Sequence, residues 1–324
     1  MINCLICNKS DHVSFLSDYL LEIKEDHDFF KNAKIYRCSS CDFAFVNPMP
    51  SEEKLSEFYE KVYRSAGRPP YLVSENYEDQ KKHYLEDKNL SYLLYLTTLV
   101  DIKKIKNLYD FGGGDGDLGY ALKQKFPHLQ LYCTEGDKYC EKILNDRGFI
   151  NFKDIKSIDK KFDLIITTHS LEHLSSVNPI FKKFKELLNP NGLIFFEVPN
   201  CPEEYWKGRP YDGPHLMFYT KKSFEKIIKL QGFELINFSH SAYTFDKDHQ
   251  YQREAQDSHY KGKNSLFSIN RIKKIIKKFV PKKAISFRQD FLQIRNIRNE
   301  NRLNWFVNNT GDNCYIRGVL KKIN

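Results

Sequence analysis

The spacing of hydrophobic and polar residues changes along the chain, and each change predicts a different kind of element. Apolar and charged residues alternate between Val13 and Ile35, which predicts small strands. After Ser51, whose hydroxyl suits a helix start, apolar residues follow at helical spacing from Leu55 to Val62. Between residues 106 and 200, short apolar runs alternate with helical patterns. That alternation predicts a parallel sheet with helices on both faces.

The segments on either side of this sheet complete the predicted organisation. Ser65–Pro70 contains helix-breaking residues and predicts a loop between two helices. Ile269–Val280 is amphipathic at helical spacing, and Tyr315–Lys321 alternates like a last edge strand that completes the sheet. We therefore expect a ribbon with paired cysteines (1–48), a helical linker or lid (49–105), a ligand-binding α/β domain (106–240) and a C-terminal extension, helical with a last edge strand (241–324).

A glycine-rich turn lies at the first strand of the predicted sheet. Asp110 ends an apolar run, glycines follow at alternate positions, and a helical pattern begins directly afterwards; these glycines are Gly112, Gly114 and Gly116. Glycines let a ligand approach the backbone closely, and the helix start offers it unpaired N–H groups. Glu135 ends the next apolar run about 20 residues further on, where a carboxylate reaches ribose hydroxyls in nucleotide-binding sheets.

Four ordered blocks resemble the class I S-adenosylmethionine (SAM) methyltransferases. The spacing Asp-x-Gly-x-Gly-x-Gly from Asp110 resembles their motif I and differs from the Gly-x-Gly-x-x-Gly of dinucleotide folds. Phe162–Leu174, which ends in Leu-Glu-His-Leu, is similar to their fourth-strand segment, and Asn191–Asn200 is similar to their fifth strand. A late segment, from Pro214-His-Leu to Gly232-Phe, is also similar. The resemblance implies a Rossmann-like, doubly wound, mostly parallel sheet.

The resemblance also implies which residues bind SAM. The glycine loop passes under the amino-acid end of the cofactor, with Asp110 facing that end and Glu135 holding the ribose diol. Asp154 is expected at the adenine amino group, with Ile155 against the adenine face. The expected cofactor-binding set is Asp110, Gly112, Gly114, Gly116, Glu135, Asp154 and His169.

Four of the eight cysteines are paired as Cys-x-x-Cys knuckles about 30 residues apart; they are Cys4, Cys7, Cys38 and Cys41. Two such knuckles supply the four thiolates of a tetrahedral zinc site, which leaves no open position and is therefore structural. The knuckles and the helix after them resemble the zinc-binding N-terminal module of a methyltransferase group often associated with sugar modification. We expect a zinc ribbon with a structural Zn²⁺.

Candidate catalytic residues follow the fourth and fifth strands. We favour His215, in the loop Gly213-Pro-His-Leu, as the base that accepts the acceptor's proton, with His169 as its rival. Glu172 is expected to orient the acceptor or a histidine, and His173 to pack or cap. The loop before His215 carries aromatic and basic residues that suit binding of a phosphorylated sugar or simple packing; they are Tyr205, Trp206, Arg209 and Tyr211. In the helical linker, a lid over the cofactor or an ordinary linker surface is expected at Tyr63, Arg64 and Tyr77.

Composition and charge add information about partners. Lys and Arg exceed Asp and Glu by nine, an excess that suits an acidic partner. Residues 261–290 carry ten basic side chains and one acidic one, which favours either a peripheral contact with anionic membrane lipid or a solvated basic helix face. No N-terminal stretch resembles a signal peptide, and the mostly apolar run Leu90–Val100 is too short to cross a bilayer. We expect a cytoplasmic protein.

These observations predict a SAM-dependent methyltransferase. The leading hypothesis is O-methylation of a sugar, or of a nucleotide- or phosphate-linked precursor, in capsule or lipopolysaccharide biosynthesis. The alternative is a zinc-ribbon RNA methyltransferase, which the acid-rich segment between the knuckles disfavours, so that we expect no nucleic-acid partner. A third hypothesis is a non-catalytic protein that binds the cofactor. The sequence leaves open the acceptor, the atom methylated and the oligomeric state.

Overall fold

The computed structural model describes residues 2–21, 26–63, 92–203, 205–208, 212–241 and 315–323. Arg64, Tyr77, Arg209 and Tyr211 lie outside these residues, as does the basic segment 261–290. Within the described ranges, no helix combines the length and the apolar character that a membrane crossing requires.

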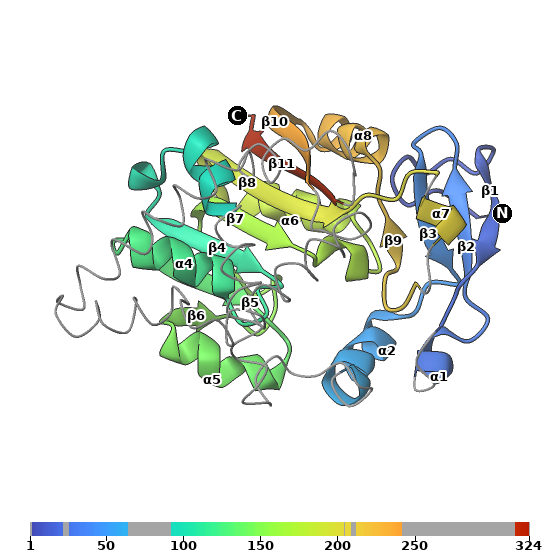
Figure 1. Ribbon diagram of the computed structural model, residues 1–324, viewed down its shortest axis with the longest axis horizontal. Helices are drawn as coiled ribbons and strands as arrows, with labels where there is room; N and C mark the ends of the chain where they lie inside the picture. Colours follow the sequence, from blue (N-terminus) through green and yellow to red (C-terminus); the bar gives the residue numbers. More distant parts are fainter. Residues whose placement is uncertain are drawn as a thin grey trace, which may run out of the picture. The chain divides into compact units, whose positions relative to one another are not determined.

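A seven-stranded sheet forms the centre of the fold, with strand order β10-β11-β8-β7-β4-β5-β6 (Figure 1). Strands β6, β5, β4, β7 and β8 are parallel, and β11 is antiparallel to β8. The strands are β4 (Asn107–Phe111), β5 (Gln130–Thr134), β6 (Phe149–Asn151), β7 (Phe162–Thr168), β8 (Leu188–Pro199), β10 (Phe233–Ser241) and β11 (Tyr315–Lys322). This arrangement confirms the predicted Rossmann-like, mostly parallel sheet.

The helices of this sheet begin and end where the sequence supplies the caps. The side chain of Thr220 accepts a hydrogen bond from the Ser223 N–H, and Gly232 at φ 66° ends the same helix. Right-handed crossovers run in opposite directions on the two sides of β4, which places α4 and α5 on one face and α6 on the other. The helices are α4 (Asp117–Lys125), α5 (Lys138–Asp146), α6 (Asn178–Leu187), α7 (Tyr205–Gly208) and α8 (Lys221–Gln231).

A second, four-stranded antiparallel sheet contains the N-terminal strands in the order β1-β2-β3-β9. Its strands are β1 (Val13–Asp18), β2 (Lys34–Cys38), β3 (Phe43–Asn47) and β9 (Met217–Phe218), with α1 (His27–Phe30) between β1 and β2. The predicted helix after Ser51 is present as α2 (Glu52–Glu57) and η2 (Phe58–Val62), and the Ser51 hydroxyl accepts from Lys54 N–H. Because β9 comes from the loop that carries His215, residues 1–48 do not form this sheet alone.

The prediction of Tyr315–Lys321 as a last edge strand is wrong in one respect. A strand is present there, but β11 lies between β8 and β10, so that β10 is the edge. Its interior position explains the complete burial of Arg317, whose Nη2 lies 2.7 Å from Oε2 of the equally buried Glu197 on β8. The phenol of Tyr92, in helical residues 92–99, donates to Oε1 of the same carboxylate at 2.6 Å.

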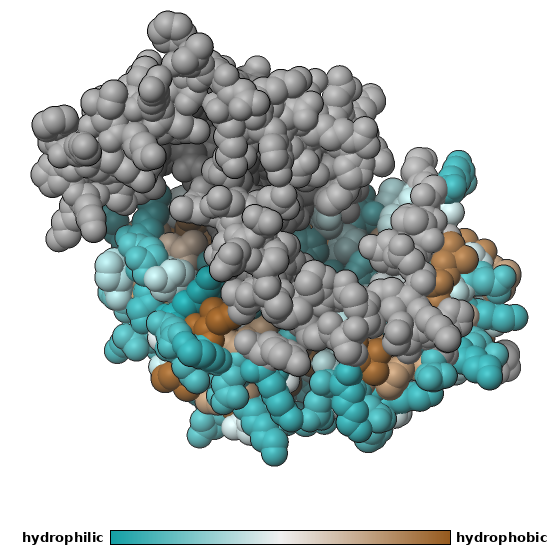
Figure 2. Space-filling view, turned by 60° about the horizontal axis from the view of Figure 1, so that its bottom comes forward, coloured by the Kyte–Doolittle hydropathy of each residue, from teal (hydrophilic) through white to brown (hydrophobic). Residues whose placement is uncertain are grey.

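The described surface is mainly hydrophilic on the face shown in Figure 2, with hydrophobic side chains in small groups. The large hydrophobic residues that remain exposed come from different elements; they are Phe15, Leu20, Ile150, Leu230, Ile236 and Ile323. Isolated residues of this kind are ordinary on protein surfaces and indicate no particular binding face.

The buried Arg317–Glu197 pair leads to a stability prediction. Arg317→Met removes the cation and leaves a buried carboxylate, which costs about 3–5 kcal/mol of unfolding free energy. Urea unfolding measures this loss. Lys321→Met on the same strand, which removes a half-exposed cation, is expected to change stability by less than about 1 kcal/mol. Equal effects of the two substitutions would contradict the assignment.

Candidate functional site

The predicted site residues lie at the carboxyl ends of the parallel strands. Asp110 is in β4, Glu135 follows β5 and His169 follows β7. The strand order reverses between β4 and β7, and ligands of open α/β sheets bind in the crevice at such a point. The Ser170 hydroxyl donates to the Gly112 carbonyl at 3.0 Å and thus joins the two loops across the reversal.

The glycine loop has the backbone that its sequence predicts. Gly112, Gly114 and Gly116 have φ values of 65°, 54° and 72°, in the left-handed region that favours glycine. A Cβ on Gly112 would meet Ser170 Oγ at 2.5 Å, whereas a Cβ on Gly114 would meet no atom within 4 Å. The loop is therefore closed toward β7 and open at Gly114, where the backbone is accessible to a ligand.

Two carboxylates border this loop. Asp110 is buried under this loop. Gly113 lies so close above its side chain that a Cβ at Gly113 would be 2.8 Å from the Asp110 carboxyl carbon. Glu135 accepts the Gly114 N–H at Oε2 and the Asp137 N–H at Oε1, each at 2.8 Å. Burial, followed by repulsion from Glu135, raises the pKa of Asp110 to about 8. The arrangement favours a cationic group of a ligand near Asp110.

Two further residues lie near the positions where we expect the ribose and the adenine of SAM. Asn151 contacts both the N–H and the carbonyl of Glu135, at 3.0 and 3.1 Å, and so orients that residue. Sequence reasoning missed Asn151, although it ends β6 at the same edge of the sheet. Asp154 Oδ1 accepts the N–H groups of Lys156 and Ser157, at 2.6 and 2.9 Å. The contact between Asp154 and adenine stays a prediction.

His169 and Glu172 lie at the end of β7. His169 has φ 53°, and its ring lies between two carboxylates: Nε2 is 3.2 Å from Glu197 Oε1, and Nδ1 is 3.5 Å from Glu172 Oε1. Burial raises the pKa of Glu172, but the nearby imidazoles outweigh burial and hold that pKa below its usual value. Both ring nitrogens of His169 therefore face carboxylates of the protein, which leaves this ring less available to an acceptor.

His215 lies beside His173, with ring centroids 4.9 Å apart. Backbone bonds hold its loop: the Leu216 N–H donates to the Glu172 carbonyl at 2.7 Å, and the His215 N–H donates to the Asp212 carbonyl. From the N-terminal part, the Tyr19 phenol donates to the His215 carbonyl at 2.9 Å. The structure therefore brings His215, His173 and Glu172 together, with His169 next to Glu172.

Aromatic side chains lie next to His173 and next to β9, which follows His215. The Tyr59 ring lies 6.1 Å from the His173 ring, and Tyr63 lies 5.2 Å from Tyr59, so the lid candidate Tyr63 is connected to the site. Tyr205 and Trp206 in α7 pack on Phe218, with centroids 6.3 and 5.1 Å from it. This contact agrees with the packing alternative and leaves sugar stacking as a prediction.

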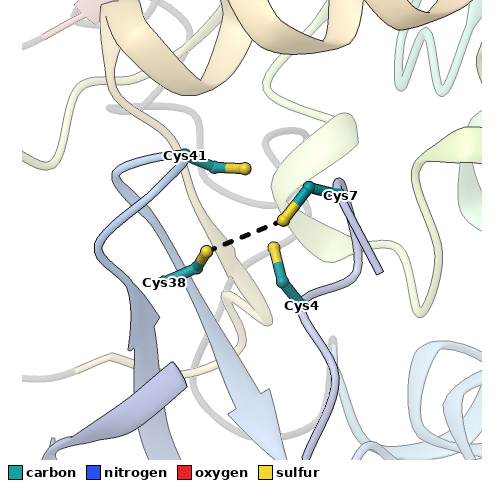
Figure 3. A group of neighbouring side chains, drawn as sticks. All are labelled: Cys4, Cys7, Cys38 and Cys41. Atoms are coloured by element: carbon teal, nitrogen blue, oxygen red, sulfur yellow. Dashed lines mark hydrogen bonds between the residues drawn. The ribbon is translucent and has the colours of Figure 1, made fainter. Parts of the chain in front are cut away.

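The four cysteines of the two knuckles meet at one point, and Figure 3 shows their sulfur atoms directed toward one another. All four Sγ atoms lie within 4.8 Å of one another, and Cys7 Sγ is 3.8 Å from Cys38 Sγ. Sulfurs bound at about 2.3 Å around a tetrahedral zinc are about 3.8 Å apart. The donor set and its spacing therefore fit zinc.

Sequence reasoning missed Glu197 and Arg317, which position His169. The available signal was an ionisable residue inside each of two apolar strand segments, Phe195–Val198 and Ile316–Leu320. Such residues are rarely buried without a partner.

Comparison with known proteins identifies the class of this site. Residues 81–237, just under half of the chain, match a family model described as a methyltransferase domain. No curated protein sequence matches the chain.

The chain is also similar to solved structures of methyltransferases. A SAM-dependent methyltransferase of Thermotoga maritima is 16% identical with a TM-score of 0.42, over 55% of this chain and 85% of that one. The O-methyltransferase of a polyketide synthase multienzyme of Brevibacillus brevis, solved with S-adenosylhomocysteine, is 15% identical with a TM-score of 0.45, over 78% and 77%. Magnesium protoporphyrin IX methyltransferase of Synechocystis is 13% identical with a TM-score of 0.46, over 60% and 95%.

The family match agrees with the sheet order and the glycine loop. The chain contains a class I SAM-dependent methyltransferase domain, and SAM is its methyl donor.

The buried Asp110 makes SAM binding depend on pH. Below pH 8 the Asp110 carboxyl of the free protein holds a proton, whereas the positive charges of SAM favour the carboxylate. Binding must then release this proton, and the apparent affinity should rise roughly ten-fold from pH 6 to pH 7. Calorimetric titration measures this slope.

Two variants make the pH measurement specific to Asp110. Asp110→Asn is expected to bind SAM weakly, with an affinity that no longer rises with pH. Asp146→Asn, at an exposed residue of α5, is expected to keep the wild-type affinity and its pH dependence. A slope that persists in Asp110→Asn would assign the proton to another group.

Proposed function

We propose that this enzyme methylates a hydroxyl group of a sugar, or of its nucleotide- or phosphate-linked precursor, in capsule or lipopolysaccharide biosynthesis. The sugar assignment is supported by the resemblance of the knuckle module to that of sugar-modifying methyltransferases. The observation that carries O-methylation is the position of His215, beside Glu172 and His173 at the strand ends where the sheet order reverses.

The reaction needs an acceptor in line with the methyl group and a way to remove its proton. The acceptor hydroxyl gives its proton to His215 while its oxygen forms a bond to the methyl carbon. The carbon–sulfur bond breaks with its electron pair on sulfur, which leaves neutral S-adenosylhomocysteine. Positioning supplies much of the rate, and a general base contributes roughly 10²–10⁴-fold.

The two candidate bases differ in their surroundings. The ring nitrogens of His169 face the carboxylates of Glu172 and Glu197, so that this residue is better suited to position Glu172 than to meet an acceptor. The loop of His215 is fixed through its backbone, by Tyr19 and Asp212. These contacts support His215 as the group that meets the acceptor.

The cysteine cluster is proposed to hold a structural Zn²⁺. Cys38 ends β2, which pairs with β3, and β3 in turn pairs with β9, two residues after His215. Zinc would supply no chemistry to methyl transfer, because all four of its positions are filled by protein thiolates. Its proposed effect is to hold the sheet that supports the His215 loop.

Substitution of His215 tests the catalytic assignment. His215→Ala is expected to lower kcat for an accepted acceptor roughly 10²–10⁴-fold, because general-base help is lost, with the SAM affinity unchanged. The measurement is transfer of labelled methyl from SAM to a panel of nucleotide sugars and to RNA. His12→Ala, at a histidine of the N-terminal part, serves as the control with normal turnover.

Two outcomes would overturn these assignments. Full turnover by His215→Ala would remove His215 from catalysis. Labelling of RNA, with salt-sensitive retention and no labelling of sugars, would replace the sugar function with the RNA alternative.

Loss of a knuckle cysteine tests the zinc proposal. Cys38→Ser is expected to lose about one zinc per chain and several kcal/mol of unfolding free energy, because structural zinc contributes directly to folding. Elemental analysis and urea unfolding measure the two effects. Cys201→Ala, at a buried cysteine outside the knuckles, should keep its zinc. An unchanged zinc content in Cys38→Ser would contradict the proposal.

A further inference from the structure

Glu172, His173 and His215 form a second group of potential metal ligands, apart from the cysteines. Each offers one ligand atom, and the three atoms lie within 4.8 Å of one another. Glu172 and His173 come from the 3-10 turn η4 (Leu171–His173) directly after β7, and His215 comes from the loop before β9. The group therefore lies at the strand ends where the order of the sheet reverses.

The carboxylate of Glu172 is the unusual member of this group. Its residue is 1% exposed, and neither of its oxygens has a hydrogen bond among the described residues. Nδ1 of His169 lies 3.5 Å from Oε1, beyond the length of a good hydrogen bond. A buried carboxylate without hydrogen bonds costs free energy, and a bound cation would remove that cost.

The ring of His173 is held in an orientation suited to an ion, and the backbone of the His215 loop is held beside it. Nδ1 of His173 lies 3.4 Å from the carbonyl of Pro214, so that it can donate there and leave Nε2 as an acceptor. Metal-binding histidines ordinarily donate their second nitrogen to a carbonyl or carboxylate in this way. The bond from Leu216 N–H to the Glu172 carbonyl, at 2.7 Å, joins the His215 loop to η4.

From this geometry we propose that Glu172, His173 and His215 bind a divalent transition-metal ion. Two imidazoles and one carboxylate suit zinc, iron or manganese, and three protein ligands leave open positions for another molecule. Ligand atoms at about 2.1 Å from such an ion are about 3.4 Å apart, a spacing that side chains whose ligand atoms lie within 4.8 Å of one another can reach by small movements.

The ion would take up the acceptor oxygen at its open position. This role rests on the proposed O-methylation, whereas ion binding itself does not. A hydroxyl bound to a divalent ion has a lowered pKa, so that its proton passes to solvent water as the oxygen attacks the methyl carbon and the carbon–sulfur bond breaks. With the ion bound, His215 is one of its ligands, and this role replaces the proton acceptance proposed above for the ion-free site.

A titration with Mn²⁺ tests the site. The full-length protein is first given one equivalent of zinc per chain, which the four thiolates take up in preference to two imidazoles and one carboxylate, so that the second group stays open to Mn²⁺. Mn²⁺ is then added, and the free ion is measured by electron paramagnetic resonance. We expect about one Mn²⁺ per chain, with affinity at least roughly ten-fold lower in Glu172→Gln and in His173→Ala. His12→Ala should bind as the wild type does.

The outcomes separate this inference from the proposed function. Absence of Mn²⁺ binding in the wild type, or equal binding in folded Glu172→Gln and His173→Ala, would overturn the metal site; circular dichroism checks the fold of each variant. Methyl transfer that persists undiminished in a chelator would remove the ion from the reaction and leave the methyltransferase function intact. Mn²⁺ binding without methylation of any hydroxyl acceptor would support the site and contradict the proposed function.

Discussion

Glu197 is completely buried in β8, and its carboxylate contacts groups from three distant parts of the chain. Oε2 lies 2.7 Å from Arg317 in β11, while Oε1 accepts from Tyr92 at 2.6 Å and lies 3.2 Å from His169. A buried carboxylate that loses its partners destabilises a fold by several kcal/mol, so these groups constrain one another. The C-terminal strand, the helix before β4 and the end of β7 are thereby fixed around one anion, and the imidazole of His169 with them.

Different parts of the chain form the two sides of the site. The loops after β4 and β5 form the side where we expect SAM, with Asp110 and Glu135, and the Ser170–Gly112 bond connects this side to the end of β7. The other side consists of η4 and the His215 loop, which the N-terminal part supports through Tyr19 and through β9. The cysteine cluster thus belongs to the structure that supports the His215 side, although it lies outside residues 81–237, which match the methyltransferase family model.

Local patterns predicted what depends on local structure. Short segments of sequence determine turn geometry and the spacing of metal ligands. For this reason the sequence predicted the left-handed glycines, the strand ends and the four converging cysteines. The pairing partners of β11 and β9 were not, because strand order depends on contacts between residues far apart in sequence. The Glu197–Arg317 ion pair could not be predicted for the same reason, because its members are separated by 120 positions (317 − 197). The contacts of Asp154 with adenine and of the α7 aromatics with a sugar stay predictions.

The central claim is that SAM binds where the sheet order reverses, with its methyl group directed at the His215 side. A crystal structure with bound S-adenosylhomocysteine tests this most directly. The account predicts the ribose hydroxyls on Glu135, the amino-acid end over the Gly112–Gly116 loop, and the sulfur between that loop and the group formed by Glu172, His173 and His215. A ribose away from Glu135, or a sulfur on the opposite side of the loop from these residues, would contradict it.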